Sequence, residues 1–248
     1  MSMNILLFGY GKMGRVIEQI ALDRGHQIVG RVDRKDDSGT DPDQLPDDAV
    51  DVVIEFTTPE SAVENITYCF QRGWPVVCGT TGWLSRLAEV EELCRQHKGS
   101  FFYASNYSIG VNLFFRLNKI LAKFMRNYPS YHVSMTEIHH TEKKDAPSGT
   151  AITLAQGVLE HLPHKSRWID KSDVQSADDD AIVIESLREG TVPGTHTIRY
   201  DSDVDRIEIT HTAHSRQGFA LGAVVAAEWL PGHEGVFGMD DLLNFNEE

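Results

Sequence analysis

Cationic and polar side chains are concentrated between residues 137 and 150 of an otherwise acidic chain. This segment contains two histidines, two lysines and a Pro-Ser-Gly-Thr turn. A histidine titrates in the range in which it can give a proton to a reacting centre, and a lysine provides a point charge for a carboxylate. We therefore take His139 as a candidate proton donor and Lys143 as a candidate contact for an anionic substrate.

The elements on either side of this segment must position its side chains. Residues 131–138 are predicted to form a strand, and residues 151–162 a helix. The start of that helix offers free backbone N–H groups and the positive end of the helix dipole, so Gly149 and Thr150 could hold an anionic group. His140 is a further candidate substrate contact, although adjacent strand residues face opposite ways and the two histidines could point apart.

Net charge and cysteine content limit the class of protein. The 248 residues include 23 Lys and Arg against 37 Asp and Glu, a net charge of −14. Such a field repels nucleic acids and anionic membranes, so we expect neither as a partner. The three cysteines lack metal-binding spacing, and the chain shows neither a signal peptide nor an apolar run of about 20 residues. We expect reduced thiols, no bound metal and a cytoplasmic protein.

A glycine-rich turn follows the first predicted strand. Residues 4–8 are apolar, the turn Gly9-Tyr-Gly-Lys-Met-Gly14 comes next, and residues 15–24 have a helical pattern. A second strand, residues 27–32, ends at an acid, Asp33. This order is typical of dinucleotide-binding units, whose glycines permit a tight turn, close approach of a pyrophosphate and close packing of the helix. We assign cofactor contacts to Gly9, Tyr10, Gly11, Lys12, Met13, Gly14, Asp33 and Arg34.

The residues after the second strand leave two cofactors open. Asp33 favours NADH, because its carboxylate can accept hydrogen bonds from a ribose diol and would repel a 2′-phosphate. Arg34 and Lys35 follow directly and could hold that phosphate. We predict that both NADH and NADPH are used.

Strands and helices alternate through the rest of the first domain. The sequence predicts strands at 50–56, 74–78 and 100–103, with helices at 61–72 and 84–96 between them. This alternation predicts a doubly wound Rossmann domain with a parallel sheet, whose ligands lie across the carboxyl ends of the strands. We therefore expect the nicotinamide end of the cofactor beside Gly79, Thr80, Thr81, Ala104, Ser105, Asn106 and Tyr107.

The pattern changes after residue 107. A long helix, 109–124, precedes four predicted strands, of which those at 181–186, 195–200 and 206–212 follow one another without crossover helices. This favours an α+β second domain with an open mixed sheet. We expect a dinucleotide-binding domain of residues 1–107, completed by 216–248, and a substrate-binding and oligomerisation domain of residues 108–215.

Taken together, these motifs resemble those of the 4-hydroxy-tetrahydrodipicolinate reductase (dihydrodipicolinate reductase) family over nearly the whole chain. The resemblance includes Phe56-Thr-Thr-Pro59, Gly79-Thr-Thr-Gly82, Ser105-Asn-Tyr-Ser-Ile-Gly-Val-Asn112 and, most specifically, His139-His-x-x-Lys-x-Asp-Ala-Pro-Ser-Gly-Thr150. It departs from the common family pattern in a glycine turn one residue shorter, and in Thr141-Glu142, where some members carry a basic pair.

The resemblance implies an enzyme of lysine and diaminopimelate biosynthesis that reduces 4-hydroxy-tetrahydrodipicolinate to tetrahydrodipicolinate with NADH or NADPH and loss of water. It implies that His139 is the general acid, that Lys143 and His140 contact this small dicarboxylate, and that Gly149 and Thr150 bind its other carboxylate. It also implies a homotetramer joined through the sheet of the second domain.

Two alternatives remain open on the sequence. One is another NAD(P)-dependent dehydrogenase, acting on a different small anionic metabolite or a sugar. The other is a non-catalytic NAD(P)-sensing protein, which would need no acid–base residues and should tolerate the loss of His139 and Lys143.

Overall fold

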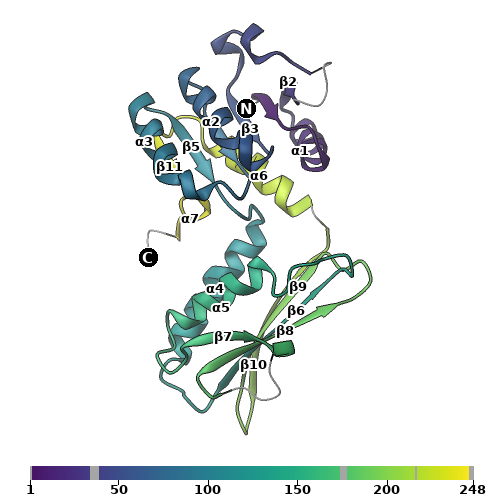
Figure 1. Cartoon of the computed structure of the whole chain (residues 1–248), viewed down its shortest axis with the longest axis vertical. Coiled ribbons are helices and arrows are strands. Elements are labelled where there is room, and N and C mark those ends of the chain that lie inside the picture. The colour runs from purple at the N-terminus through teal and green to yellow at the C-terminus, as the bar shows by residue number, and fades with distance from the viewer. Residues whose placement is uncertain (1, 34–38, 174–177, 216, 246–248) are drawn as a thin grey trace. The chain divides into compact units, whose positions relative to one another are not determined.

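The computed structural model describes residues 2–33, 39–173, 178–215 and 217–245. The chain divides into two compact units (Figure 1). Unit 1 combines Met1–Ile109 with Gln217–Glu248, and unit 2 is Gly110–Arg216. The final helix therefore returns to the unit that contains the N-terminus.

Unit 1 is built on a six-stranded sheet in the order β11-β5-β4-β3-β1-β2. All of its strand pairs are parallel, which confirms the predicted doubly wound Rossmann fold. The strand order reverses beside β1, and ligands of such sheets bind at that reversal. The strands are β1 (Asn4–Phe8), β2 (Gln27–Val32), β3 (Val52–Glu55), β4 (Val76–Cys78), β5 (Ser100–Tyr103) and β11 (Gly235–Phe237).

Helices cover both faces of this sheet because its strands are apolar on both faces. Along β1, Ile5 and Leu7 face the core that contains α1 and α6, whereas Leu6 and Phe8 face the core that contains α2 and α3. The helices are α1 (Lys12–Asp23), α2 (Pro59–Gln71), α3 (Leu87–His97), α6 (Gln217–Trp229) and the short α7 (Met239–Leu242). Short 3-10 turns, η1 (Pro42–Gln44), η2 (Asp47–Ala49) and η3 (Leu84–Arg86), complete the described part of the unit.

Unit 2 has a five-stranded sheet in the order β10-β9-β6-β8-β7. β6 pairs antiparallel with β9 and parallel with β8, so the sheet is mixed, as the sequence predicted. Its elements are α4 (Ile109–Met125), β6 (His132–His139), α5 (Gly149–Leu159), β7 (Arg167–Asp170), η4 (Lys171–Asp173), β8 (Ala181–Arg188), β9 (Gly194–Asp201) and β10 (Arg206–Ala213).

The two faces of the second sheet differ in polarity. One face packs against α4 and α5, through residues such as Met135, Leu154 and Ile198. The alternate residues face away from this core, and among them Arg199 donates hydrogen bonds to Thr136 and Glu208 at 3.1 and 2.5 Å. The glutamate and histidine side chains at the end of β6 lie on the helix-covered face.

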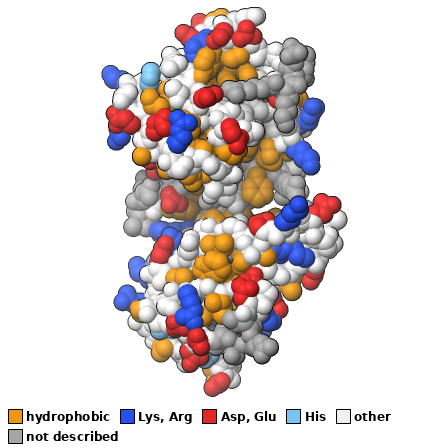
Figure 2. Space-filling view, in the orientation of Figure 1, with side chains coloured by type: hydrophobic (Ala, Val, Ile, Leu, Met, Phe, Trp, Pro, Cys, Tyr) orange, Lys and Arg blue, Asp and Glu red, His pale blue; other side chains and the backbone are white. Residues whose placement is uncertain are grey.

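Charged side chains of both signs are scattered over the visible surface of each unit (Figure 2). Within the residues described, none of the helices is long and apolar enough to cross a membrane. Because the net charge is −14, the overall electrostatic field repels anions. The binding of an anion therefore depends on positively charged groups and N–H groups close to it.

Candidate active site

The glycine turn of unit 1 is shaped by contacts that leave no room for a side chain at its first and last glycines. Gly9 has a φ of +92°, and a Cβ there would lie 2.0 Å from the carbonyl oxygen of Phe56. A Cβ on Gly14 would lie 2.3 Å from the carbonyl oxygen of Gly9. A Cβ on Gly11 would meet nothing within 4 Å, so the backbone there is open to a ligand. The turn and the start of α1 therefore fit a pyrophosphate, which hydrogen-bonds to helix N-terminal N–H groups.

A cavity of about 390 Å³ opens beside this turn. Phe56, Thr57 and Asn65 line it, and so does Asp33, the residue that follows β2. This places the predicted ribose acceptor at the same cavity as the turn. Arg34 and Lys35, which are candidates to hold a 2′-phosphate, lie outside the described residues. The full lining is Phe8, Gly9, Tyr10, Gly11, Val32, Asp33, Phe56, Thr57, Thr58, Glu60, Ser61 and Asn65.

The two predicted nicotinamide-contacting loops are held by internal hydrogen bonds. The Thr80 hydroxyl accepts from the Thr57 N–H at 2.7 Å, and the Tyr107 hydroxyl donates to the Cys78 carbonyl at 2.7 Å. Both side chains are buried, so they shape the loops, whereas Thr81 and Ser105 are exposed. The other predicted contacts in these loops are Gly79 and Asn106, which are half-buried, and Ala104, which is buried. Lys12 is exposed and Met13 half-buried on the first turn of α1.

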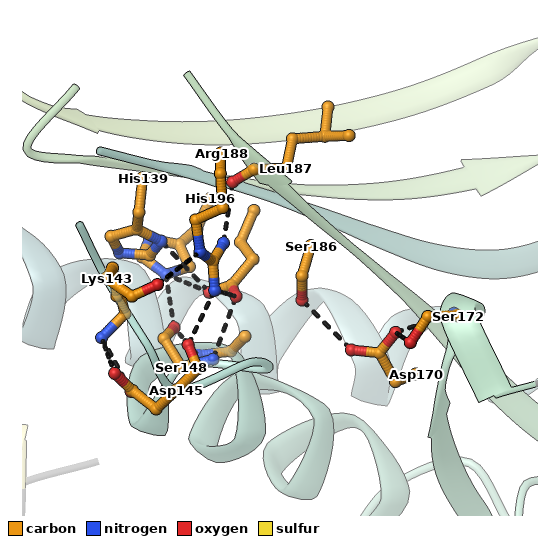
Figure 3. Close-up of polar contacts among 12 residues, drawn as sticks. His139, Lys143, Asp145, Ser148, Asp170, Ser172, Ser186, Leu187, Arg188 and His196 are labelled. Atoms are coloured by element: carbon orange, nitrogen blue, oxygen red, sulfur yellow. Dashed lines mark hydrogen bonds and ion pairs between the residues drawn. The ribbon is translucent and has the colours of Figure 1, made fainter. Parts of the chain in front are cut away.

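A buried polar cluster occupies the end of β6 in unit 2. Glu137 and His139 are two residues apart on the strand, so their side chains share the face that packs against α5. β9 adds His196, β8 adds Arg188, and the start of α5 adds Ser148 (Figure 3). His139 Nδ1 lies 3.4 Å and His196 Nε2 lies 3.6 Å from the same oxygen of Glu137.

The cluster holds a negative charge beside a neutral imidazole. Burial opposes ionisation of Glu137, but contacts with His196 and Ser148 outweigh it and lower the pKa of the carboxyl to about 2. Burial lowers the pKa of His139 to about 4, although Glu137 opposes this shift. His139 is therefore neutral near pH 7 in the free chain, and a dianionic ligand beside it would favour its protonation.

Lys143 is held close to the cluster by the loop between β6 and α5. Its ammonium group pairs with Asp145 at 2.7 Å, and an incoming carboxylate would compete with this partner. Arg188 braces the loop by donating to the carbonyl oxygens of Lys143 and Asp145 at 3.2 and 2.7 Å (Figure 3). The cation of Lys143 is thus presented on a loop that is tied to the sheet.

The start of α5 is a capped helix terminus. Ser148 is its N-cap, and the Ser148 hydroxyl accepts from the Ala151 N–H at 3.2 Å. Gly149 and Thr150 are the first two helical residues, and a Cβ on Gly149 would meet nothing within 4 Å. The space above these N–H groups suits a carboxylate.

His140 follows the last residue of β6 and lines a cavity of about 330 Å³ with Thr141, Gly190 and Pro193. His139 does not line that cavity. The role of His140 as a substrate contact stays a prediction.

Comparison with known proteins identifies the family of this chain. The N-terminal family model of dihydrodipicolinate reductase matches residues 3–107, and the C-terminal model matches residues 110–243. The 4-hydroxy-tetrahydrodipicolinate reductase of Christiangramia forsetii is 51% identical over 98% of this chain and 98% of its own length. The chain belongs to the dihydrodipicolinate reductase family. This confirms the family, and with it the reductase class, expected from the sequence.

Other relatives of the dihydrodipicolinate reductase family agree. The 4-hydroxy-tetrahydrodipicolinate reductase of Methanosarcina mazei is 38% identical, covering 78% of this chain and 73% of its own. A dipicolinate-bound dihydrodipicolinate reductase from Paenisporosarcina sp. TG-14 matches with a TM-score of 0.80 and 23% identity, covering 97% of this chain and 99% of its own. That structural match supports the two-unit reductase fold.

Sequence reasoning missed several residues of both regions in this reductase. Thr57 and Asn65 line the cavity beside the glycine turn. The Phe-Thr-Thr-Pro motif after β3 was a signal for Thr57, whereas no motif marked Asn65, which lies within α2. Glu137 could have been found from its two-residue spacing to His139. Arg188 and His196 could not, because only the pairing of β6 with β8 and β9 brings them there.

Proposed function

We propose that this chain reduces 4-hydroxy-tetrahydrodipicolinate with NADH or NADPH, with loss of water, to tetrahydrodipicolinate. The reaction belongs to lysine and diaminopimelate biosynthesis. The observation that carries the proposal is the group at the end of β6. A buried imidazole lies there beside Lys143 and the start of α5, which suits a ring with two carboxylates.

Each group has a separate task in the proposed reaction. The reduced nicotinamide supplies the hydride when it is bound. Gly9, Gly11 and Gly14 form the turn that receives its pyrophosphate. Lys143 holds one substrate carboxylate, and the N–H groups of the first turn of α5 hold the other. His139 gives the proton that must accompany the hydride, and it acquires that proton more readily once the dianion is bound.

Steady-state oxidation of NADH and NADPH tests this proposal directly. With freshly generated 4-hydroxy-tetrahydrodipicolinate we expect turnover with both cofactors, and the two kcat/KM values should differ by less than about a thousandfold, ~4 kcal/mol. Pyridine-2,6-dicarboxylate should inhibit in competition with the substrate. Absence of turnover, with activity on a sugar or an amino acid instead, would assign the chain to another dehydrogenase class.

We also propose a homotetramer joined through the sheet of unit 2. The support is the face that turns away from α4 and α5, where the exposed Thr210 pairs with the buried Thr197 across strands at 3.1 Å. Light scattering after gel filtration should give a mass four times 27.8 kDa. Thr210→Arg should break the assembly, and a monomer in the parent chain would refute it.

We place the enzyme in the cytoplasm. All three cysteines, Cys69, Cys78 and Cys94, are buried free thiols, and burial raises the pKa of Cys94 to about 11. Such thiols suit a reducing compartment. Cell fractionation with a periplasmic marker would test this, and recovery outside the cytoplasm would contradict it.

A further inference from the structure

One oxygen of Glu137 lies between two imidazole rings. Its Oε2 is 3.4 Å from His139 Nδ1 and 3.6 Å from His196 Nε2. The two rings meet edge to face, with centroids 5.1 Å apart. Glu137 is fully buried, and His139 is only 7% exposed. A carboxylate so placed has two ring nitrogens, and little water, to interact with.

The facing atoms of Glu137 and His139 lie close together without a hydrogen bond. Among the residues that the structure describes, neither Glu137 Oε2 nor His139 Nδ1 makes a hydrogen bond, although both atoms are buried. Leaving such atoms unpaired is costly. Catalytic hydrogen bonds are often long in a free enzyme and shorten in the complex. A shift of a few tenths of an ångström would make this contact a charge-assisted hydrogen bond.

The other oxygen of Glu137 is tied to the start of α5. Oε1 accepts from the Ser148 N–H at 3.0 Å and lies 3.4 Å from the Arg188 guanidinium. The Ser148 hydroxyl in turn contacts His196 Nε2 at 3.2 Å. One carboxylate thus connects the proposed proton donor to the helix terminus that is proposed to hold a substrate carboxylate.

The opposite edge of the His139 ring is kept open by a glycine. A Cβ on Gly194 would lie 3.1 Å from His139 Nε2. Any side chain there would therefore press on the nitrogen that faces away from Glu137. Nδ1 of the ring thus faces Glu137 Oε2, and Nε2 faces a residue without a side chain.

We propose that Glu137 is a positioning residue for His139. Its carboxylate holds the Nδ1–H of His139 and so leaves Nε2 to exchange the proton. The same carboxylate fixes the start of α5, and His196 keeps Glu137 in place. The assignment of a proton-exchanging His139 rests on the function proposed above. The arrangement follows the general rule that the partner of one ring nitrogen sets the tautomer and orientation of an imidazole.

A shared metal ion is the main rival explanation. The ligand atoms of Glu137, His139 and His196 lie within 4.8 Å of one another. However, Glu137 already accepts from the Ser148 N–H and lies beside the Arg188 cation. Donors and a positive charge around the carboxylate favour a role in holding protons over a role in holding a cation.

The charges around His139 fix the direction of the pH effect. Glu137 on the same strand raises the pKa of His139, whereas His196 on β9, Lys143 on the loop and Arg188 on β8 lower it. Glu137→Gln removes the one charge that favours the imidazolium. The limb on which kcat/KM falls with rising pH should therefore move to lower pH in this variant.

Kinetics of the assembled enzyme with both substrates test the proposal. Glu137→Gln should lower kcat at least 50-fold, while the affinity for pyridine-2,6-dicarboxylate stays within threefold or tightens, because the amide oxygen can still accept from Ser148. Glu137→Asp should recover at least a fifth of the wild-type kcat. Asp170→Asn is the matched control, since Asp170 is a buried carboxylate bonded to Ser172 in the same sheet, and it should keep kcat within twofold.

A kcat of Glu137→Gln within threefold of wild type, with an unchanged pH profile, would overturn the proposal. Loss of dicarboxylate affinity parallel to kcat would reduce Glu137 to a structural role. Inactivation by a chelator, reversed by zinc, would assign the cluster to a metal. If the variant does not fold, ¹⁵N-histidine spectra of the wild-type protein decide: the proposal requires a protonated Nδ1 on neutral His139. That readout remains valid even if the enzyme proves to act on another substrate.

Discussion

The two proposed binding regions of this reductase, one in each unit, differ in the groups that form them. The glycine turn of unit 1 depends on backbone contacts, since Gly9 and Gly14 leave no room for a side chain and Gly11 faces open space. The cluster in unit 2 is made of side chains from three strands and one helix terminus, with Glu137 at its centre. One region depends on shape, and the other depends on charge and proton position.

This contrast predicts how each region should fail. A region that depends on close backbone contacts should lose stability and ligand together when a methyl group is added. A region that depends on buried charges should keep its fold and lose chemistry, and its behaviour should change with pH. The following predictions run from the largest expected effect to the smallest.

Gly9→Ala should have the largest effect. Its Cβ would overlap the Phe56 carbonyl, and φ is +92°, so we expect a loss of about 3 kcal/mol in unfolding free energy and at least 100-fold in NADPH affinity. Gly25→Ala is the control, because Gly25 also has a positive φ, +87°, but has open space around it, and it should cost only about 1 kcal/mol. Urea unfolding and NADPH fluorescence titration measure both. Equal costs would show that backbone conformation, rather than close approach, governs the turn.

His139→Ala and Lys143→Ala should each lower turnover at least ~100-fold while leaving NADPH affinity within threefold. The reason is that both side chains lie in unit 2, whereas the glycine turn lies in unit 1. Lys144→Ala, at an exposed neighbouring lysine, should stay within twofold. A loss under threefold in both site variants would remove these residues from the mechanism.

Acid should destabilise the wild type through His139. The pKa of this residue is about 4 in the folded chain and about 6.5 when unfolded. The unfolding free energy that depends on a neutral His139 is therefore fully present above pH 6.5 and is lost as the pH falls towards 4. Between pH 7 and pH 5 the wild type should lose about 2 kcal/mol more than His139→Gln. Denaturant unfolding at the two pH values gives the difference. An identical pH dependence in the two proteins would mean that His139 is not buried as described.

Asp33→Asn should shift cofactor preference towards NADPH by roughly tenfold in kcat/KM, about 1.4 kcal/mol. The carboxylate lines the cavity of unit 1 and would repel a 2′-phosphate. Parallel titrations with NADH and NADPH distinguish a change in cofactor preference from a general loss of cofactor binding. An equal change for both cofactors would mean that Asp33 does not contact the ribose.

Asp145→Asn should have the smallest effect. It removes the exposed partner of Lys143, and exposed ion pairs contribute at most about 1 kcal/mol. Affinity for pyridine-2,6-dicarboxylate should therefore rise two- to fivefold. Calorimetric titration would reveal this, and weaker binding would show that Asp145 holds Lys143 in its binding position rather than competing for it.

Local patterns were sufficient for much of the fold. The buried runs at β1 and β3 and the glycine turn between strand and helix predicted the Rossmann domain, because a parallel sheet needs apolar strands and crossover helices. β7 and β11 were missed. β7 lies in a segment that reads as polar and acidic, and β11 has only three residues, which is too few to show a periodicity.

For this protein, the sequence alone determined the family, the glycine turn and the proximity of His139 to Lys143, because each is encoded within a short stretch. The tertiary structure decided what surrounds them. Arg188 and His196 lie 51 and 59 residues away from Glu137 in the chain and reach it only through the register of β6 with β8 and β9. Strand pairing across such distances is set by the packing of the whole sheet, so the charge environment of His139 could not be inferred from local sequence.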